Sequence, residues 1–162
     1  MRITSISSTA SATVMIADFV NVDAVGKVNI IGGGIQPLGL NPVTGLTASF
    51  SVFVNVTVSI PLFSDSAAAV EMVLVNTDGQ PVTVAGPERQ GIMRFTQDLD
   101  FRFSGEPNIQ QPPLGFPGSS NMVLNFSGGL PLNAGETYEW DVLLDQRRLS
   151  SITFFVAGAE TQ

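Results

Sequence analysis

A run of glycines after a β-branched segment could form a phosphate-binding loop: Gly32, Gly33 and Gly34. Such a loop needs a following helix whose N-terminus faces the anion, and often a lysine directly after the glycines. Here Lys27 precedes the glycines, and Pro37 and Pro42 prevent a helix after them. We therefore expect the glycines to form a bulge or bend that turns the chain between sheets, where positive φ angles are required.

Acidic side chains could supply oxygen ligands for calcium or the paired carboxylates of a glycosidase. Asp98 and Asp100 lie two residues apart on one expected strand face, and Asp141 and Asp145 flank another expected strand. Two arginines share the face of the first pair, and cross-strand ion pairs with them would neutralise these carboxylates; they are Arg94 and Arg102. No acidic residue lies in a segment apolar enough to raise its pKa, so we expect neither a metal site nor paired catalytic carboxylates.

The composition excludes several other classes of site. The chain has no histidine and no cysteine, which removes the commonest general base, the commonest metal ligand and any thiolate chemistry. Its net charge of −7 argues against nucleic acid and against an anionic membrane surface as partners. We therefore expect a protein that is not an enzyme and uses no cofactor.

A period of two in hydrophobicity predicts the elements that carry these residues. In the 48–60 segment the even-numbered residues are apolar and the odd-numbered ones mostly polar, which is typical of a strand with one buried face. The segments 94–103 and 137–144 repeat this pattern, and the latter places Tyr138 and Trp140 on its inward face. About eight or nine such strands between turn signals indicate an all-β fold, an immunoglobulin-like antiparallel β-sandwich.

Turn residues support antiparallel pairing of these strands. Gly79 follows Asp78 between two apolar runs, a pattern that favours a type I′ hairpin turn. Gly135 lies in the turn before the strand that opens with Tyr138, as at the tyrosine corner of immunoglobulin-like sandwiches, where the phenol oxygen bonds back to the backbone. An ordinary half-buried tyrosine remains the alternative.

Two segments fall outside the strand pattern. Residues 1–12 are rich in Ser and Thr, and we expect them to form a mobile N-terminal arm on a single domain of residues 13–162. Residues 105–121 carry four prolines and predict a long loop. Its apolar residues favour contact with a partner, although the loop could also fold back over its own sandwich.

Apolar residues at polar positions suggest an interface. Hydrophobic residues make up 44% of the chain and charged residues only 13%, so we expect part of the surface to be covered by another chain, as in a homo-oligomer. Phe53, Val73, Val75, Leu143 and Phe155 fall on the nominally polar faces of their strands, unless those strands are buried on both faces. The predicted partner contacts are Ile3, Ile6, Ile109, Leu114, Phe116, Phe53 and Phe155.

The two ends of the chain resemble an uncharacterised domain family of actinobacteria and their phages. The resemblance is carried by the segments 17–19, 22–23, 26–30 and 32–33, which read A-D-F, V-D, G-K-V-N-I and G-G, and by Pro131-Leu132, Gly135, Tyr138, Trp140 and the 154–156 segment. The family brings no established activity, so no catalytic residue is implied. A weaker likeness, of architecture alone, is to phage capsid decoration proteins.

These observations predict a non-enzymatic structural protein of a bacteriophage virion, such as a capsid decoration or minor structural subunit. Its arm and loops would dock on other subunits, for example a major capsid protein, after assembly in the host cytoplasm. One alternative is a β-sandwich module that binds a sugar or a peptide. Another is a cytoplasmic host protein.

Overall fold

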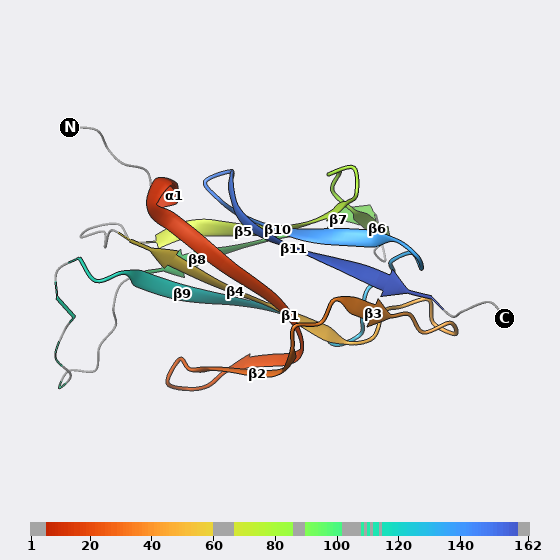
Figure 1. Cartoon of the computed structure of the whole chain (residues 1–162), viewed down its shortest axis with the longest axis horizontal. Helices are drawn as coiled ribbons and strands as arrows, with labels where there is room; N and C mark the ends of the chain where they lie inside the picture. Colours follow the sequence, from red (N-terminus) through yellow and green to blue (C-terminus); the bar gives the residue numbers. More distant parts are fainter. Residues whose placement is uncertain are drawn as a thin grey trace.

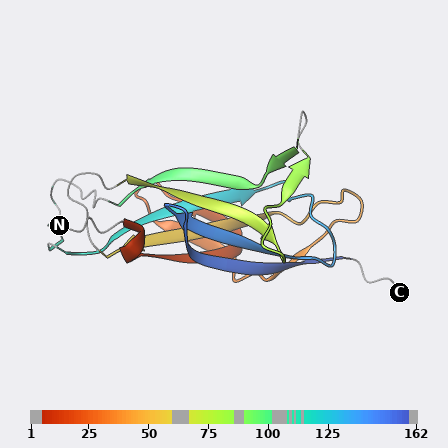
Figure 2. The ribbon, with the colours of Figure 1, turned by 90° about the horizontal axis from the view of Figure 1, so that it is seen from above.

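Two β-sheets packed face to face form the body of the protein (Figure 1). The computed structural model describes residues 6–59, 67–85, 90–101, 108, 110, 112–113 and 115–158. The strands of both sheets run along the long axis of the molecule, and a small two-stranded hairpin projects near one end (Figure 2). The predicted all-β sandwich is confirmed.

The first sheet has four strands and the second has five. In spatial order, the four-stranded sheet consists of β2 (Val28–Gly33), β1 (Ala10–Val22), β4 (Phe50–Val58) and β9 (Gly118–Phe126). The five-stranded sheet consists of β3 (Pro37–Gly39), β11 (Arg147–Ala157), β10 (Thr137–Leu144), β5 (Ala67–Asn76) and β8 (Arg94–Asp100). The projecting hairpin consists of β6 (Thr83–Ala85) and β7 (Gln90–Ile92).

The core lies between the two sheets and follows the predicted alternation. In β4, Phe50 and every second residue after it are buried, and in β10 the same holds from Tyr138 to Leu144. Aromatic rings fill the centre: Phe126 stacks on Phe50 with ring centroids 4.9 Å apart and on Trp140 at 5.6 Å. Large apolar side chains on both inner faces hold the sheets together because their burial removes them from water.

The tyrosine corner is confirmed by one hydrogen bond. The backbone N–H of Asn133 donates to the phenol oxygen of Tyr138 over 3.1 Å. Gly135 lies in the intervening turn with φ of +79°. This bond fixes the chain where it enters β10.

The type I′ turn lies at another hairpin than predicted. Gly79 has a φ of +74°, but Asp78 is not among the residues with positive φ, so the turn after β5 is not of type I′. Asp145 and Gln146, with φ of 50° and 63°, instead form a two-residue turn between β10 and β11. The type of this turn was not predicted because neither of its two residues is a glycine.

The expected mobile arm of residues 1–12 is contradicted from residue 6 onward, and residues 1–5 lie outside the described ones. Residues Ile6–Thr9 form the short helix α1, and Ala10 begins β1, where it pairs with Val58 of β4. Arg147 donates from Nη1 to the backbone oxygen of Ser7 over 2.6 Å, which ties α1 to the turn between β10 and β11. The prediction was wrong from residue 6 onward because a Ser/Thr-rich segment gives no hydrophobic pattern, although its backbone can still pair.

Other differences concern short or irregular segments. The structure has eleven strands in its described residues, because β3, β6 and β7, with three residues each, are too short to show an alternation. β3 also pairs with β11 in parallel, which departs from an all-antiparallel sandwich. In the expected loop of residues 105–121, β9 begins at Gly118, and residues 105–107, 109, 111 and 114 lie outside the described ones.

The glycine run lies where the chain crosses from the four-stranded sheet to the five-stranded sheet. Gly32 and Gly34 have φ of +63° and +87°, and the chain then continues into β3 and not into a helix. Gly33 is not among the residues with positive φ; a Cβ there would lie 2.7 Å from Met15 Sδ, so a larger residue would have to displace the Met15 side chain. The segment is thus a bend, as expected, and Gly32 and Gly34 supply its positive φ angles.

Candidate interaction surface

The largest concentration of exposed apolar side chains among the described residues lies on the hairpin of β1 and β2, residues 17–33, here called the β1–β2 hairpin. Most large hydrophobic side chains of the body are buried, but on this hairpin five are exposed, from 38% to 72%: Phe19, Val22, Val25, Ile30 and Ile31. A cluster of this kind is unusual on a protein surface and typically marks an interaction site. We therefore take the β1–β2 hairpin as the candidate site.

A tight polar turn holds the tip of the hairpin. The carboxylate of Asp23 accepts backbone N–H groups from Val25 and Lys27 over 3.0 and 2.9 Å, and the N–H of Asp23 donates to the Lys27 carbonyl. Gly26 has a φ of +82°, which closes the turn. An aspartate that accepts from the backbone two to four residues ahead stabilises such a turn without help from the body.

The strand register sorts the hairpin residues onto two faces. Phe19 pairs with Ile31, and the next pair on the same face is Asn21 with Asn29. The opposite face carries Val20 paired with Ile30. Phe19 and Ile31 are 49% and 62% exposed, so they form an apolar pair that we call the outer face of the hairpin.

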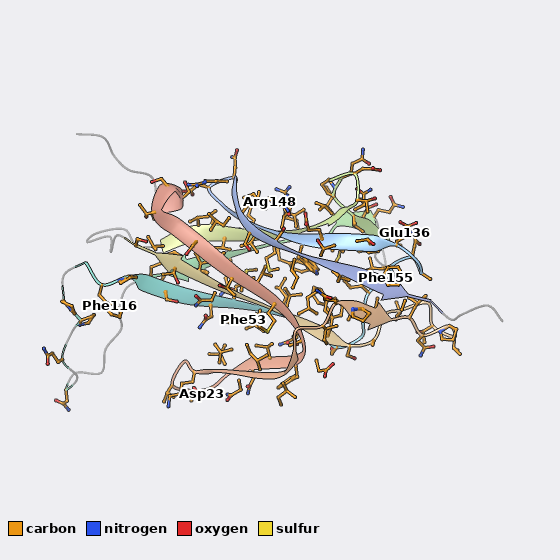
Figure 3. All side chains as sticks on the ribbon, in the orientation of Figure 1. Asp23, Phe53, Phe116, Glu136, Arg148 and Phe155 are labelled. Carbon is orange, nitrogen blue, oxygen red and sulfur yellow. The ribbon has the colours of Figure 1, made fainter. Side chains whose placement is uncertain are left out.

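The inner face of the hairpin is turned toward the four-stranded sheet. Figure 1 shows the hairpin bent back beneath that sheet, and Figure 3 places Phe53 on the side of the sheet that faces it. Val20 is fully buried although it does not belong to the cluster between the sheets. The hairpin is thus anchored by its inner face and presents its outer face to solvent.

The predicted partner contacts that lie among the described residues do not converge on one surface. Phe116 and Phe155 are 52% and 43% exposed but lie toward opposite ends of the molecule (Figure 3), and Phe53 is half-buried on β4. Ile6 packs against the chain's own core and not on a free arm, which corrects its assignment. Ile3, Ile109 and Leu114 lie outside the described residues.

The apolar residues on polar strand faces have two different explanations. Val73 and Val75 of β5 are only 4% and 5% exposed, so their strand is buried on both faces and they cannot serve as an interface. Leu143 is half-buried, while Phe155 is exposed.

The sequence did not predict the β1–β2 hairpin as an interface. Ile30 and Ile31 are adjacent in the sequence, which breaks the alternation that marks one face of a strand.

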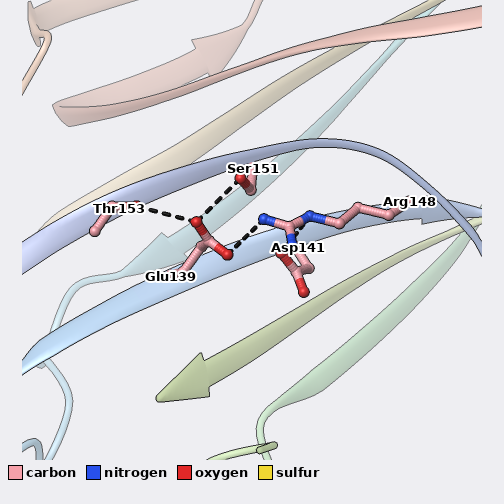
Figure 4. Close-up of polar contacts among 5 residues, drawn as sticks. All are labelled: Glu139, Asp141, Arg148, Ser151 and Thr153. Carbon is pink, nitrogen blue, oxygen red and sulfur yellow. Dashed lines mark hydrogen bonds and ion pairs between the residues drawn. The ribbon is translucent and has the colours of Figure 1, made fainter. Parts of the chain in front are cut away.

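A charged cluster lies on the outer face of β10 and β11 in the five-stranded sheet (Figure 4). Glu139 accepts hydrogen bonds from Ser151 and Thr153, at 3.1 and 3.0 Å, and from Arg148. Arg148 also lies 3.0 Å from Asp141, between Nε and Oδ1. One guanidinium therefore bridges two carboxylates on β10, and β11 supplies every donor.

The two carboxylates of this cluster have pKa values shifted in opposite directions. Burial raises the pKa of Glu139, but the hydrogen bonds from Thr153 and Ser151 and the charge of Arg148 outweigh it, so the pKa lies below its ordinary value of 4.5. Burial raises the pKa of Asp141 above its ordinary value of 3.8; Arg148 opposes this shift and the charge of Glu139 adds to it. Only Glu139 is therefore stabilised in its charged form.

Glu139→Gln is expected to destabilise the protein by about 1 kcal/mol at neutral pH, because it removes a charged acceptor of three hydrogen bonds. A lowered pKa in the folded state contributes stability above the unfolded value of about 4.5, and this contribution is lost as the pH falls through the folded pKa. The difference between wild type and variant should therefore shrink on acidification. Urea unfolding at neutral and acidic pH measures it, and a difference that grows in acid would contradict the assignment.

Asp141→Asn is the control, because its stability difference from wild type should change with pH in the opposite direction. The pKa of Asp141 is raised by burial, so the stability contributed by its neutral form is present below the unfolded value of about 3.8 and is lost as the pH rises. The Asn variant should accordingly gain stability relative to wild type as the pH rises through this range.

The described residues also show another ion pair of this sheet and bear on possible metal sites and membrane spans. Arg94 pairs with Glu71 of β5 over 2.9 Å. Among the described residues, no three Asp, Glu, His or Cys side chains are grouped so that they could hold a metal ion. In the same part of the chain, no helix is long and apolar enough to cross a membrane.

Comparison with known proteins identifies a family. A family model described as "Family of unknown function (DUF6941)" matches residues 12–157. No curated protein matches the chain. The match begins within β1 and ends at the last residue of β11, so it covers both sheets of the sandwich.

Proposed function

We propose that this chain, which belongs to the family of unknown function DUF6941, is a non-enzymatic structural subunit of a bacteriophage particle. It docks on other particle subunits, for example a major capsid protein, through the outer face of its β1–β2 hairpin. The observation that carries the proposal is the exposure of Phe19 and Ile31, paired on a hairpin that the body already holds in place. When a partner covers such a pair, the burial of apolar surface stabilises the complex. The entropic cost of binding is small because the hairpin is already ordered.

Two further observations support a role in assembly. The chain has few charged residues, so little of its surface is strongly hydrated. The motif segments in residues 17–33 that resemble domains of actinobacteria and their phages are those of the β1–β2 hairpin. That resemblance covers cellular as well as phage domains. We choose a phage particle, with the virion as the location, over a cytoplasmic host protein because few charges and an exposed apolar pair suit a subunit that docks on a larger assembly.

The first test is whether the chain is part of the particle. Gradient-purified particles from the strain that encodes it should contain the chain, as detected by mass spectrometry, in a fixed ratio to the major capsid protein. Its presence in the cytoplasmic fraction alone would favour the host-protein alternative and overturn the proposal.

The second test addresses the hairpin itself. The double variant Phe19→Ser/Ile31→Ser should fold normally, since both side chains are exposed, but its co-sedimentation with particles lacking the chain should fall at least about tenfold. Val43→Ser is the matched control, because Val43 is 91% exposed and lies outside the hairpin. Equal binding of the double variant and the control would remove the outer face from the proposal.

A binding module for a sugar or a peptide is the second candidate. A hollow of about 450 Å³ lies beside the charged cluster and offers the carboxylate of Glu139 and the guanidinium of Arg148. Trp140 is fully buried and cannot stack on a sugar ring, so the polar groups of this hollow suit a peptide better. Chemical-shift changes at Glu139 and Arg148 on titration with peptides, absent in Glu139→Gln, would favour this function.

A further inference from the structure

The free edge of β2 is the least protected strand edge among the described residues. β8, at one edge of the five-stranded sheet, carries Arg94 and two aspartates, and β3 at the other edge is short and contains Pro37. β9, the other edge of the four-stranded sheet, is uncharged like β2, but most of its residues are half-buried or buried, and a Cβ on Gly118 at its start would overlap the carbonyl oxygen of Phe101. β2, by contrast, has the uncharged sequence VNIIGG, and all of its residues from Asn29 to Gly33 are exposed. Proteins commonly protect edge strands with charge, proline or a cover, and β2 has none of these.

The backbone of β2 offers a defined set of hydrogen-bonding groups at this edge. The bond from Asp23 N–H to the Lys27 carbonyl shows that these two residues form a hydrogen-bonded pair. Since such pairs alternate along antiparallel strands, Asn29 and Ile31 direct their backbone groups toward β1. Val28 and Ile30 therefore direct their N–H and C=O groups outward, while Gly32, with φ of +63°, ends the regular stretch.

We propose that β2 pairs antiparallel with β2 of a second copy of this chain, around a two-fold axis at Asn29. This register pairs Val28 of each copy with Ile30 of the other, and it uses only the outward groups of the regular stretch. Each hydrogen-bonded pair exchanges two bonds, so the two pairs form four backbone hydrogen bonds. A register centred on Ile30 would depend on Gly32, whose left-handed conformation interrupts the strand.

The side chains favour a second copy over an unrelated strand. On each face of the joined hairpins, the side chains of one copy meet side chains of the same chemical kind from the other copy. On one face, Asn21 and Asn29 of both copies form a continuous row of four amides, and each amide is both donor and acceptor. On the other face, Val20 and Ile30 of one copy continue into Val28 and Val22 of the other. Ile30, which is 38% exposed, gains Val28 of the other copy as an apolar neighbour, and Val28 gains Ile30. No charged residue lies within β2 to oppose the pairing.

This inference goes beyond the proposed function and does not depend on it. A two-fold axis perpendicular to the joined hairpins keeps both outer faces on the same side. The dimer would therefore present two copies of the pair formed by Phe19 and Ile31 to one surface, and this bivalency would strengthen docking without new contacts.

The absence of cysteine from the chain allows a direct test of the register. In Asn29→Cys, the two thiols face each other in a non-hydrogen-bonded pair with Cα atoms about 4.5 Å apart, within the range of a disulfide. Mild oxidation should therefore convert most of this variant into a covalent dimer. The matched control is Ile31→Cys, on the same face and 62% exposed, whose two copies would be about 13 Å apart.

Sedimentation velocity of the wild type completes the test. We expect a concentration-dependent dimer in which Asn29→Cys cross-links at least about ten times faster than Ile31→Cys. A monomer at every soluble concentration would overturn the proposal, and so would equal cross-linking of the two variants. The double variant Phe19→Ser/Ile31→Ser should still dimerise. Loss of particle binding with the dimer intact thus separates the two proposals.

Discussion

Gly129→Ala is expected to lower the free energy of unfolding by about 3 kcal/mol, which corresponds to a Tm lower by about 8 °C. Gly129 has a φ of +73°, a conformation that costs an alanine about 1–2 kcal/mol by itself. A Cβ at this position would also overlap the carbonyl oxygen of Thr47 and come within 2.9 Å of its carbonyl carbon. Both atoms are backbone, so the strain cannot be relieved by a side-chain rotation.

The neighbourhood of Gly129 increases this cost. Thr47 is 4% exposed and exchanges two hydrogen bonds with Leu130: its N–H donates to the Leu130 carbonyl over 3.0 Å, and its Oγ1 accepts from the Leu130 N–H over 2.9 Å. A shift of Thr47 that relieved the overlap would weaken both bonds. The turn after β9 would then lose its attachment to the segment before β4.

Gly128→Ala is the matched control for this prediction. Gly128 is the preceding residue, has no positive φ, and a Cβ added to it would have no neighbouring atom within 4 Å. We expect its alanine variant to unfold within about 0.5 kcal/mol of wild type. Thermal and urea unfolding followed by circular dichroism compare the two, and equal stability of both variants would contradict the proposed overlap.

Trp140→Ala should cost about 4 kcal/mol, the largest effect of any single truncation of the core. Trp140 is fully buried at the centre of β10, where its ring stacks on Phe126 and lies 6.1 Å from Phe95. Its removal leaves a cavity between the two sheets that the surrounding strands can fill only in part. Since small domains have about 5–15 kcal/mol of stability in total, this variant should be close to its unfolding midpoint in mild denaturant.

Trp140→Phe separates the effect of volume from that of polarity. The indole Nε1 of Trp140 is buried without a hydrogen-bond partner among the described residues, so phenylalanine removes an unsatisfied donor together with part of the volume. We expect a loss of about 1–2 kcal/mol, less than half that of the alanine variant. Urea unfolding measures both, and a Phe variant as unstable as the Ala variant would show that the indole nitrogen is satisfied.

The sequence pattern was sufficient for the body of the fold because each long strand has one face in the core. Phe50 and Trp140 fall on the buried faces that the alternation of their segments predicts. The tyrosine corner was also predictable, since a glycine turn followed by a tyrosine at a strand start is a local pattern. These features depend on residues close together in the sequence.

The candidate site could not be predicted in the same way because it depends on where a hairpin lies relative to a sheet distant in the sequence. Phe19 occupies a strand position that could equally be buried, and it lies in the part of β1 that pairs with β2 and not with β4. Ile6 was assigned to a free arm because the pairing of Ala10 with Val58 spans forty-eight residues and leaves no local signal. Phe155 was expected correctly on an outer strand face, but it lies on β11, beside Pro37 of β3, and not on the hairpin.

β1 pairs with β4 along its first part and with β2 along its last part, so the two ladders can open separately. Residues Ala10–Ala17 pair with β4, whereas the pairs with β2 extend from Ala17 to Val22, so Ala17 alone pairs with both neighbours. The hairpin can therefore unzip while the ladder between β1 and β4 stays closed, and its amide protons should exchange with solvent by local fluctuations well below global unfolding. A segment with this independence can be redesigned or replaced without rebuilding the sandwich that carries it.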